Sequence, residues 1–248
     1  MISEGFVIGI DDTDSAESGG TGGLVRALAA QARAEGAGEP EGVTRHALWT
    51  SDKVSATERN HCYALVLRSD RSVLDIEDFV VEFARAEAER DADPGVAILS
   101  RHSDMPHILA FGRRSQQELM RLDWAQTFST EANVALRALG RDRQGSIGAL
   151  AAVGLRAGGG DGYFIDLDGL RELNGRVTAG QIRERTIIEH VLDEDGEELD
   201  RDDLIETFDW VRPHLEEGQP TLHATRSSED RKLWLLDHRR PSDAGDED

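Results

Sequence analysis

The segment FVIGIDDTDSAESGGTGGL, which begins at Phe6, constrains the fold more than any other stretch of this sequence. The apolar run at its start predicts a short buried strand, because turn-forming residues bound it at once. Three aspartates follow directly, namely Asp11, Asp12 and Asp14. In open α/β sheets, ligands bind where the strands end. The segment therefore predicts a ligand site built on these carboxylates.

Glycines surround Thr21 immediately after the aspartates, and residues 24–36 then show helical spacing with a high alanine content. Mg²⁺ prefers oxygen ligands, so the three carboxylates are candidate metal ligands. Glycines let backbone N–H groups approach phosphate at a helix N-terminus, and the candidates are Gly19, Gly20 and Gly22. Together these features predict a site for a magnesium nucleotide. The alternative is that Asp and Gly serve here as ordinary turn residues.

A second glycine-rich turn, GSIGALAAVG at residues 145–154, leads into a helix of small residues. Taken alone, this pattern is typical of a helix that packs very closely on its neighbours. The residues that would allow such packing are Gly148, Ala149, Ala151 and Ala152.

The chain of 248 residues has 28 Lys and Arg against 49 Asp and Glu, a formal net charge of −21. A surface this acidic repels phosphate backbones, so we expect no broad nonspecific binding of nucleic acid. The composition fits either a GC-rich genome or adaptation to high salt. The acidic end, residues 237–248, predicts a disordered tail.

Cysteine and histidine usage narrows the kinds of site further. The single cysteine, Cys62, excludes an intramolecular disulfide and a Cys-based zinc site, and we expect it to be buried rather than nucleophilic. None of the 8 histidines forms a pair at helical ligand spacing, so a His-based metal site is not indicated. No apolar segment reaches membrane-spanning length, and no signal-peptide pattern begins the chain. We therefore expect a cytoplasmic protein with no membrane partner.

Strands and helices alternate along the chain, which predicts the α/β class. We expect strands at 62–69, 94–99, 221–225 and 232–238, and a further strand near the start of 163–173. We expect helices at 73–90, at 129–140 with a Ser or Thr N-cap, and within 179–192. The glycines at 158–160 predict a boundary between a domain of residues 1–157 and a smaller one of residues 158–236.

Several of these segments, in one order, resemble archaeal tRNA-isoleucine agmatidine synthetase (TiaS) over residues 8–226. They are IGIDDTDS, the glycine-rich loop with Thr21, DPGVAIL, GSIGALAAVG, and the late TFD and PTLHATR. Members of that family attach agmatine to the wobble cytidine of an isoleucine tRNA with the use of ATP. The resemblance implies an N-terminal kinase-like α/β domain followed by a ferredoxin-like α+β domain.

The resemblance also implies roles for single residues. The acidic positions that handle magnesium and phosphate match Asp11, Asp12 and Asp14. Thr21 matches the threonine that ATP phosphorylates, and the second loop, which faces the nucleotide, matches Gly145, Gly148 and Ala149. The implied cofactors are ATP and Mg²⁺, and the implied small-molecule partner is an agmatine-like amine. The resemblance does not extend to the family's OB-fold and zinc ribbon, so we expect tRNA to bind weakly or through a partner protein.

Three functions are compatible with these residues. The leading hypothesis is a stand-alone ATP-dependent enzyme that activates a carbonyl acceptor by phosphoryl or nucleotidyl transfer for ligation to an amine. The alternative is a non-catalytic paralogue that binds a nucleotide or polyamine as a sensor or partner subunit. A haloacid-dehalogenase-type phosphatase would instead use Asp12 as nucleophile and Asp14 as acid. That fold also needs a later lysine, and the sequence contexts of Lys53 and Lys232 do not favour this role.

Overall fold

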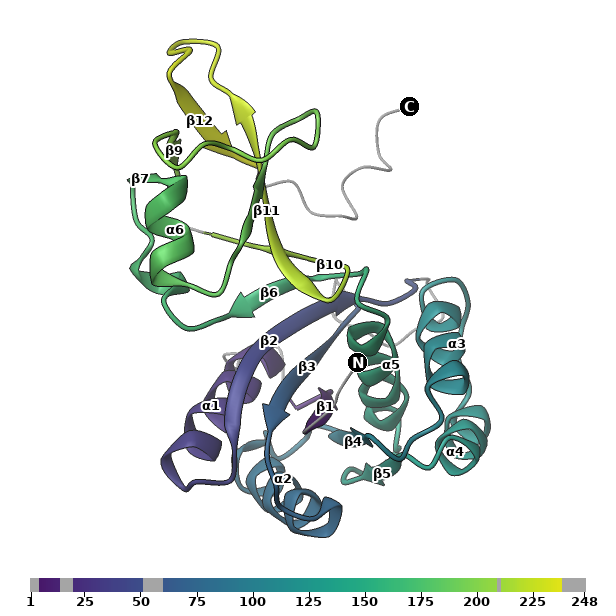
Figure 1. Ribbon diagram of the computed structural model, residues 1–248. Coiled ribbons are helices and arrows are strands. Elements are labelled where there is room, and N and C mark those ends of the chain that lie inside the picture. Colours follow the sequence, from purple (N-terminus) through teal and green to yellow (C-terminus); the bar gives the residue numbers. More distant parts are fainter. Residues whose placement is uncertain (1–4, 14–19, 51–59, 209–210, 238–248) are drawn as a thin grey trace. The chain divides into compact units, whose positions relative to one another are not determined.

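The computed structural model describes residues 5–13, 20–50, 60–208 and 211–237 (Figure 1). The chain folds into two compact units, Met1–Gly158 and Gly159–Asp248. Both units combine helices with β-strands, so the predicted mixed α/β class is confirmed. Asp14, Gly19, Lys53 and the acidic tail beyond Asp237 lie outside the described residues.

The first unit is built around one sheet. Its elements are β1 (Phe6–Asp11), α1 (Thr21–Ala34), β2 (Glu39–Ala47), β3 (His61–Arg68), α2 (Val73–Glu87), β4 (Gly95–Ser100), α3 (Met105–Ser115), α4 (Leu122–Glu131), β5 (Ala135–Ala138) and α5 (Gly145–Gly158). The strands follow the order β5-β4-β1-β3-β2, and every neighbouring pair is antiparallel. β1 therefore lies at the centre of the sheet.

The antiparallel pairing corrects the reasoning that placed the site by analogy with open α/β sheets. In those sheets the carboxyl ends of parallel strands meet at one edge. Here the neighbours of β1 run the opposite way, so Asp11 at the end of β1 pairs with Gly95 at the start of β4. The acidic motif is still at a strand end, but it faces the beginning of the next strand.

Helices cover both faces of this sheet (Figure 1). α1 and α2 pack on one face, and α5, supported by α3 and α4, packs on the other. Successive side chains of a strand point to opposite faces, so β1 contributes to both cores. Ile8 and Ile10 are fully buried toward α1, and Val7 belongs to the apolar cluster beneath α5. The same alternation directs Asp11 toward α5.

Small residues bring α5 very close to its neighbours. A Cβ added at Gly9 of β1 would overlap the carbonyl oxygen of Ala149, and one added at Gly112 of α3 would lie 2.8 Å from the backbone nitrogen of Leu155. Ala149, Ala151 and Ala152 are fully buried. The prediction of a closely packed helix after the second glycine-rich turn is therefore confirmed.

Most other elements predicted in this unit are confirmed with small shifts at their ends. The helix predicted for 24–36 is α1, and the strands predicted for 62–69 and 94–99 are β3 and β4. α2 begins at Val73 as predicted, because Ser72 and Asp75 form a capping box, and ends at Glu87. Cys62 is buried in β3, also as predicted. β2 was missed, since Pro40 and Gly42 interrupt its pattern and shift its register.

The helix predicted for 129–140 is wrong. Ser129 and Thr130 lie in the last turn of α4, where both hydroxyls donate to the carbonyl oxygen of Gln126 at 3.0 and 2.9 Å. Asn133 then takes a left-handed φ of 52° and ends the helical path. The next residues pair with β4 as strand β5. Pairing with the sheet therefore outweighs the helical propensity of the alanines and leucines.

The second unit is richer in strands. Its elements are β6 (Tyr163–Asp166), the 3₁₀ turn η1 (Leu170–Glu172), β7 (Arg176–Thr178), α6 (Ala179–Arg185), β8 (His190–Leu192), β9 (Leu204–Glu206), β10 (His214–Glu216), β11 (Gln219–Arg226) and β12 (Leu233–Leu236). The strands follow the order β6-β10-β11-β12-β9-β7, and β8 runs parallel to β11. The strands predicted here are confirmed as β6, β11 and β12. The ferredoxin-like arrangement stays a prediction.

The helix predicted within 179–192 is only half correct. A capping box between Thr178 and Gln181 starts α6, which ends at Arg185. The Thr186 hydroxyl donates back to the carbonyl oxygen of Ile182 at 2.8 Å and accepts from the backbone N–H of Ile188 at 3.1 Å. The β-branched run that follows suits an extended chain, and it continues into β8.

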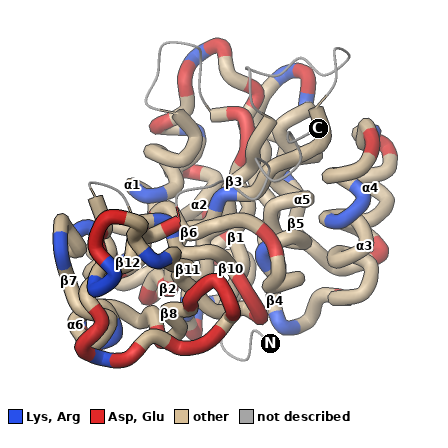
Figure 2. Tube along the Cα trace, turned by 90° about the horizontal axis from the view of Figure 1, so that it is seen from above, with Lys and Arg blue, Asp and Glu red and all other residues tan. Residues whose placement is uncertain are grey.

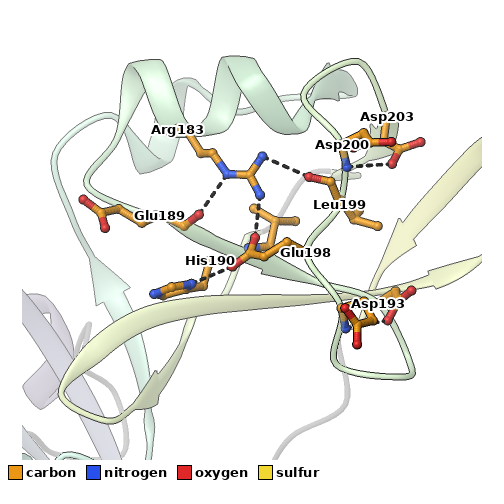
Figure 3. A network of polar contacts seen from close by, with 10 residues as sticks. Arg183, Glu189, His190, Asp193, Glu198, Leu199, Asp200 and Asp203 are labelled. Atoms are coloured by element: carbon orange, nitrogen blue, oxygen red, sulfur yellow. Dashed lines mark hydrogen bonds and ion pairs between the residues drawn. The ribbon is translucent and has the colours of Figure 1, made fainter.

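The guanidinium group of Arg183 in α6 forms hydrogen bonds to several neighbouring segments of the second unit (Figure 3). Its Nε donates to the carbonyl oxygen of Glu189 at 2.8 Å, and its Nη1 donates to that of Leu199 at 3.1 Å. Its Nη2 also contacts Glu198 at 2.6 Å, and the other oxygen of Glu198 contacts His190 Nδ1 at 2.6 Å. The guanidinium group therefore ties α6 to both sides of the acidic turn after β8.

Acidic positions occur along the loops and helices of both units, with arginines between them (Figure 2). Within the described ranges, no helix combines the length and the apolar character needed to cross a membrane.

Candidate nucleotide site

The acidic motif lies where β1 leaves the sheet. Asp11 is the last residue of the strand and is half-buried. Asp12, also half-buried, has a left-handed φ of 55°, a conformation that aspartate tolerates better than most residues. Thr13 is buried, and among the described residues its Oγ1 has no hydrogen-bond partner. Left-handed backbone at a non-glycine residue is concentrated at functional sites, so this turn is a candidate site in its own right.

Thr21 lies against this turn. It is the first residue of α1, after Gly20 with its φ of 82°, and its Oγ1 accepts a hydrogen bond of 3.3 Å from the backbone N–H of Thr13. Thr21 is 3% exposed, and Gly22 beside it is buried as well. The predicted phosphate acceptor and the N-terminus of α1 are thus placed directly beside the acidic strand end.

The N-terminus of α5 approaches the same turn from the other face of the sheet. A Cβ added at Gly148 would overlap the carboxylate of Asp11, and one added at Gly145 would lie 3.0 Å from Cβ of Asp12. Ala149, the next residue of the helix, lies under Gly9 of β1. Gly148 therefore makes room for the protein's own carboxylate, which explains the glycine without a bound phosphate.

Asp93 was not predicted as part of this region. Its Oδ1 accepts from the backbone N–H of Asp142 at 2.9 Å, and its Oδ2 accepts from that of Gln144 at 2.5 Å. It precedes a proline and β4, and it holds the loop from which α5 starts. An aspartate before Pro-Gly is a turn signal in the sequence, but its partners lie about fifty positions away and no local pattern indicates them.

The structure brings together most of the residues that the sequence singled out. At the end of β1 it gathers Asp11, Asp12, Gly20, Thr21, Gly22, Gly145, Gly148 and Ala149. Their roles in binding and catalysis stay predictions.

These residues fit a magnesium nucleotide. Asp11 and Asp12 supply the carboxylate oxygens that Mg²⁺ prefers. The first N–H groups of a helix lack partners within that helix, and the N-terminus has a positive dipole end that attracts phosphate. Both α1 and α5 begin beside the carboxylates, and Thr13 Oγ1, which has no partner within the described ranges, is buried at the same place. The donor set therefore matches the cation and the phosphates together.

Solved structures of enzymes that act on tRNA share this fold over 60% of the chain. One is a tRNA fluorescent labeling enzyme, with 23% identity and a TM-score of 0.54. The others are structures of TiaS, the tRNAIle2 agmatidine synthetase. Its complex with tRNA(Ile2) and ATP has 21% identity and a TM-score of 0.52, and its complex with tRNA(Ile2), AMPCPP and agmatine has 22% and 0.51. The resemblance to TiaS is therefore confirmed at the level of the fold.

The shared region is only a part of those enzymes. It covers 35% of the labeling enzyme and 36% of TiaS in each of its two complexes. No family model and no curated protein matches the chain.

Proposed function

We propose that the first unit binds ATP with Mg²⁺ at the end of β1 and uses it to activate a carbonyl acceptor for ligation to an amine. The observation that supports this most directly is the convergence of Asp11, Asp12 and Thr21 at the start of two helices, one from each face of the sheet. The fold resemblance to TiaS, whose solved complexes contain ATP and agmatine, supports the same reaction class.

In this proposal Asp11 and Asp12 hold Mg²⁺, which neutralises charge on the phosphate oxygens. Asp93 keeps the loop before α5 in place, so that the helix N-terminus stays aimed at the carboxylates. Thr21 accepts the γ-phosphoryl group: a bond forms from its Oγ1 to the γ-phosphorus, the bond from that phosphorus to the bridging oxygen of ADP breaks, the hydroxyl proton passes to solvent, and ADP departs. The phosphoryl group then passes to the acceptor's carbonyl oxygen, and the amine displaces it as phosphate. Because Thr21 is 3% exposed, the transfer requires ATP binding to uncover its hydroxyl.

The test is incubation of the full chain with γ-labelled ATP and Mg²⁺, followed by measurement of label on the protein and of ATP turnover. We expect label on the wild type and on Thr21→Ser, and none on Thr21→Ala. Thr130→Ala is the matched control, since Thr130 is an exposed helical threonine outside the site. Absence of both label and turnover would contradict an enzyme.

Two further measurements would favour the other functions. Calorimetric binding of ATP or agmatine without any product would favour the non-catalytic nucleotide- or polyamine-binding protein. Turnover of p-nitrophenyl phosphate that depends on Asp12 would favour a phosphatase.

A further inference from the structure

Two histidines and a glutamate meet on one face of the β10–β11 hairpin in the second unit. His214 and Glu216 belong to β10, and His223 belongs to β11. The register pairs His214 with Thr221 and Glu216 with Gln219, so alternation along each strand puts all three side chains on the same face. One ligand atom from each residue lies within 4.8 Å of the other two, and all three residues are partly buried.

The contacts within this cluster are short. His223 Nε2 lies 2.7 Å from Glu216 Oε1, and the rings of His214 and His223 are 5.4 Å apart in an edge-to-face arrangement. A metal ion binds an imidazole through a nitrogen lone pair, so that nitrogen must carry no proton in the complex.

We propose that His214, Glu216 and His223 bind one divalent transition-metal ion of the Zn²⁺ type. Two imidazole nitrogens and one carboxylate oxygen form a donor set that Zn²⁺ binds well and that Mg²⁺ avoids. Tetrahedral Zn²⁺ places its ligand atoms about 3.3 Å apart. His223 Nε2 and Glu216 Oε1, now 2.7 Å apart, must separate slightly, and the remaining separations, all within 4.8 Å, must shorten by at most roughly 1.5 Å. The ion replaces the hydrogen bond between His223 and Glu216, and any proton on that nitrogen passes to solvent. Three protein ligands leave one coordination position open.

Helical spacing is the sequence signature commonly sought for such a site, and these residues do not have it. His214 and Glu216 are two positions apart, which aligns them on a strand rather than on a helix. His223 joins them only because the chain turns back after Glu216. The site is thus a product of the hairpin register.

The test uses the metal-stripped full chain, titrated with Zn²⁺ against a chromophoric chelator in the presence of excess Mg²⁺. The Mg²⁺ occupies weak sites among the many surface carboxylates, so that the Zn²⁺ binding measured comes from sites with nitrogen ligands. We expect one Zn²⁺ per chain. His214→Ala, Glu216→Gln and His223→Gln should each lower the affinity at least about 10-fold, as losses around metal ligands commonly do. His107→Ala is the matched control, since His107 lies 3.0 Å from Asp104 in a histidine–carboxylate pair that has no third ligand in the part of the chain that the structure describes.

A measurement on the wild type alone keeps the proposal testable if a variant does not fold. Zn²⁺ should shift the imidazole NMR signals of His214 and His223 at one equivalent and leave those of His107 in place. The proposal is overturned if no stoichiometric Zn²⁺ binds in excess Mg²⁺, or if these signals do not move. It is also overturned if the folded variants keep the wild-type affinity, which would show that the cluster is only a histidine–carboxylate pair.

Discussion

A carboxylate and a glycine from opposite ends of the first unit share one small space. Asp11 at the end of β1 lies against Gly148, in the first turn of α5, where only a residue without a side chain leaves room for it. A negative charge at this end of a helix is stabilised by the helix dipole. At the scale of single residues, the candidate site therefore depends on one packed contact between two distant motifs.

Asp11→Asn retains the shape of this side chain and removes its charge. We expect the fold to persist, with a loss of about 0.3–1 kcal/mol from the helix dipole. Magnesium-dependent ATP affinity, measured by calorimetry, should fall at least about tenfold, which corresponds to ~1.4 kcal/mol. Asp70→Asn, in an exposed loop, is the control. Unchanged ATP affinity in both Asp11→Asn and Asp12→Asn would show that these carboxylates are not the metal site.

Gly148→Ala and Gly9→Ala separate ligand binding from packing. At Gly148 the new methyl group meets the carboxylate end of the Asp11 side chain, which can rotate away. We expect unfolding free energy within about 1 kcal/mol of the wild type, because better helix propensity offsets the crowding, and weaker ATP binding. At Gly9 the methyl group meets backbone of α5, which cannot move alone, so we expect a loss of about 3 kcal/mol. Equal destabilisation of both variants, seen in denaturant unfolding, would contradict this distinction.

At the scale of elements, sequence patterns predict those helices and strands that interactions between neighbouring residues determine. The capping box at Ser72, the buried runs of β1, β3 and β4, and the small-residue helix α5 were all predictable, because neighbouring residues fix them. β5 was not, since its sequence favours a helix and only pairing with β4 makes it a strand. The contact between Asp11 and Gly148, and the hydrogen bonds from the loop before α5 to Asp93, depend on how distant segments pair and pack. Residue spacing along the sequence could not predict them.

The acidic turn after β8 provides a prediction at this scale. Burial raises the pKa of Glu198, but hydrogen bonds from His190, the Val191 N–H and Arg183 outweigh it and hold the pKa below its ordinary value. A carboxyl group with a lowered pKa stabilises the fold above its ordinary pKa, and this contribution is lost as the pH falls through the lowered value.

The melting temperature of Glu198→Gln should therefore lie below that of the wild type at neutral pH, and the gap should narrow as the solution is acidified below the ordinary glutamate pKa of about 4.3. Thermal unfolding over a pH series measures this. Glu184→Gln is the control, since its carboxylate is exposed and its one ion pair among the described residues is with Arg201. A gap that stays constant with pH would show that the pKa of Glu198 is not lowered by folding.

At the scale of the whole molecule, the net charge constrains the choice of partner. The fold is shared with enzymes that act on tRNA, but it corresponds to only about a third of their length. The net charge of −21 opposes the binding of a polyanion and favours a cationic ligand such as a polyamine.

We expect the full chain to bind total tRNA weakly. Proteins gain affinity for nucleic acid by releasing counterions as basic groups replace them, so an excess of carboxylates should keep the Kd weaker than about 10⁻⁶ M at physiological salt. Arginine pairs such as Arg113–Arg114 provide only local positive charge. Filter binding across a salt series measures the affinity for tRNA. ATP consumption in the presence of agmatine, other diamines or tRNA, at low and molar salt, then shows which acceptor the protein uses. Asp11→Asn serves as the reduced-activity reference for the ATP-consumption assay. ATP consumption that rises with a diamine alone would identify a small-molecule reaction, whereas tight binding specific to isoleucine tRNA would show that a local basic surface outweighs the net charge.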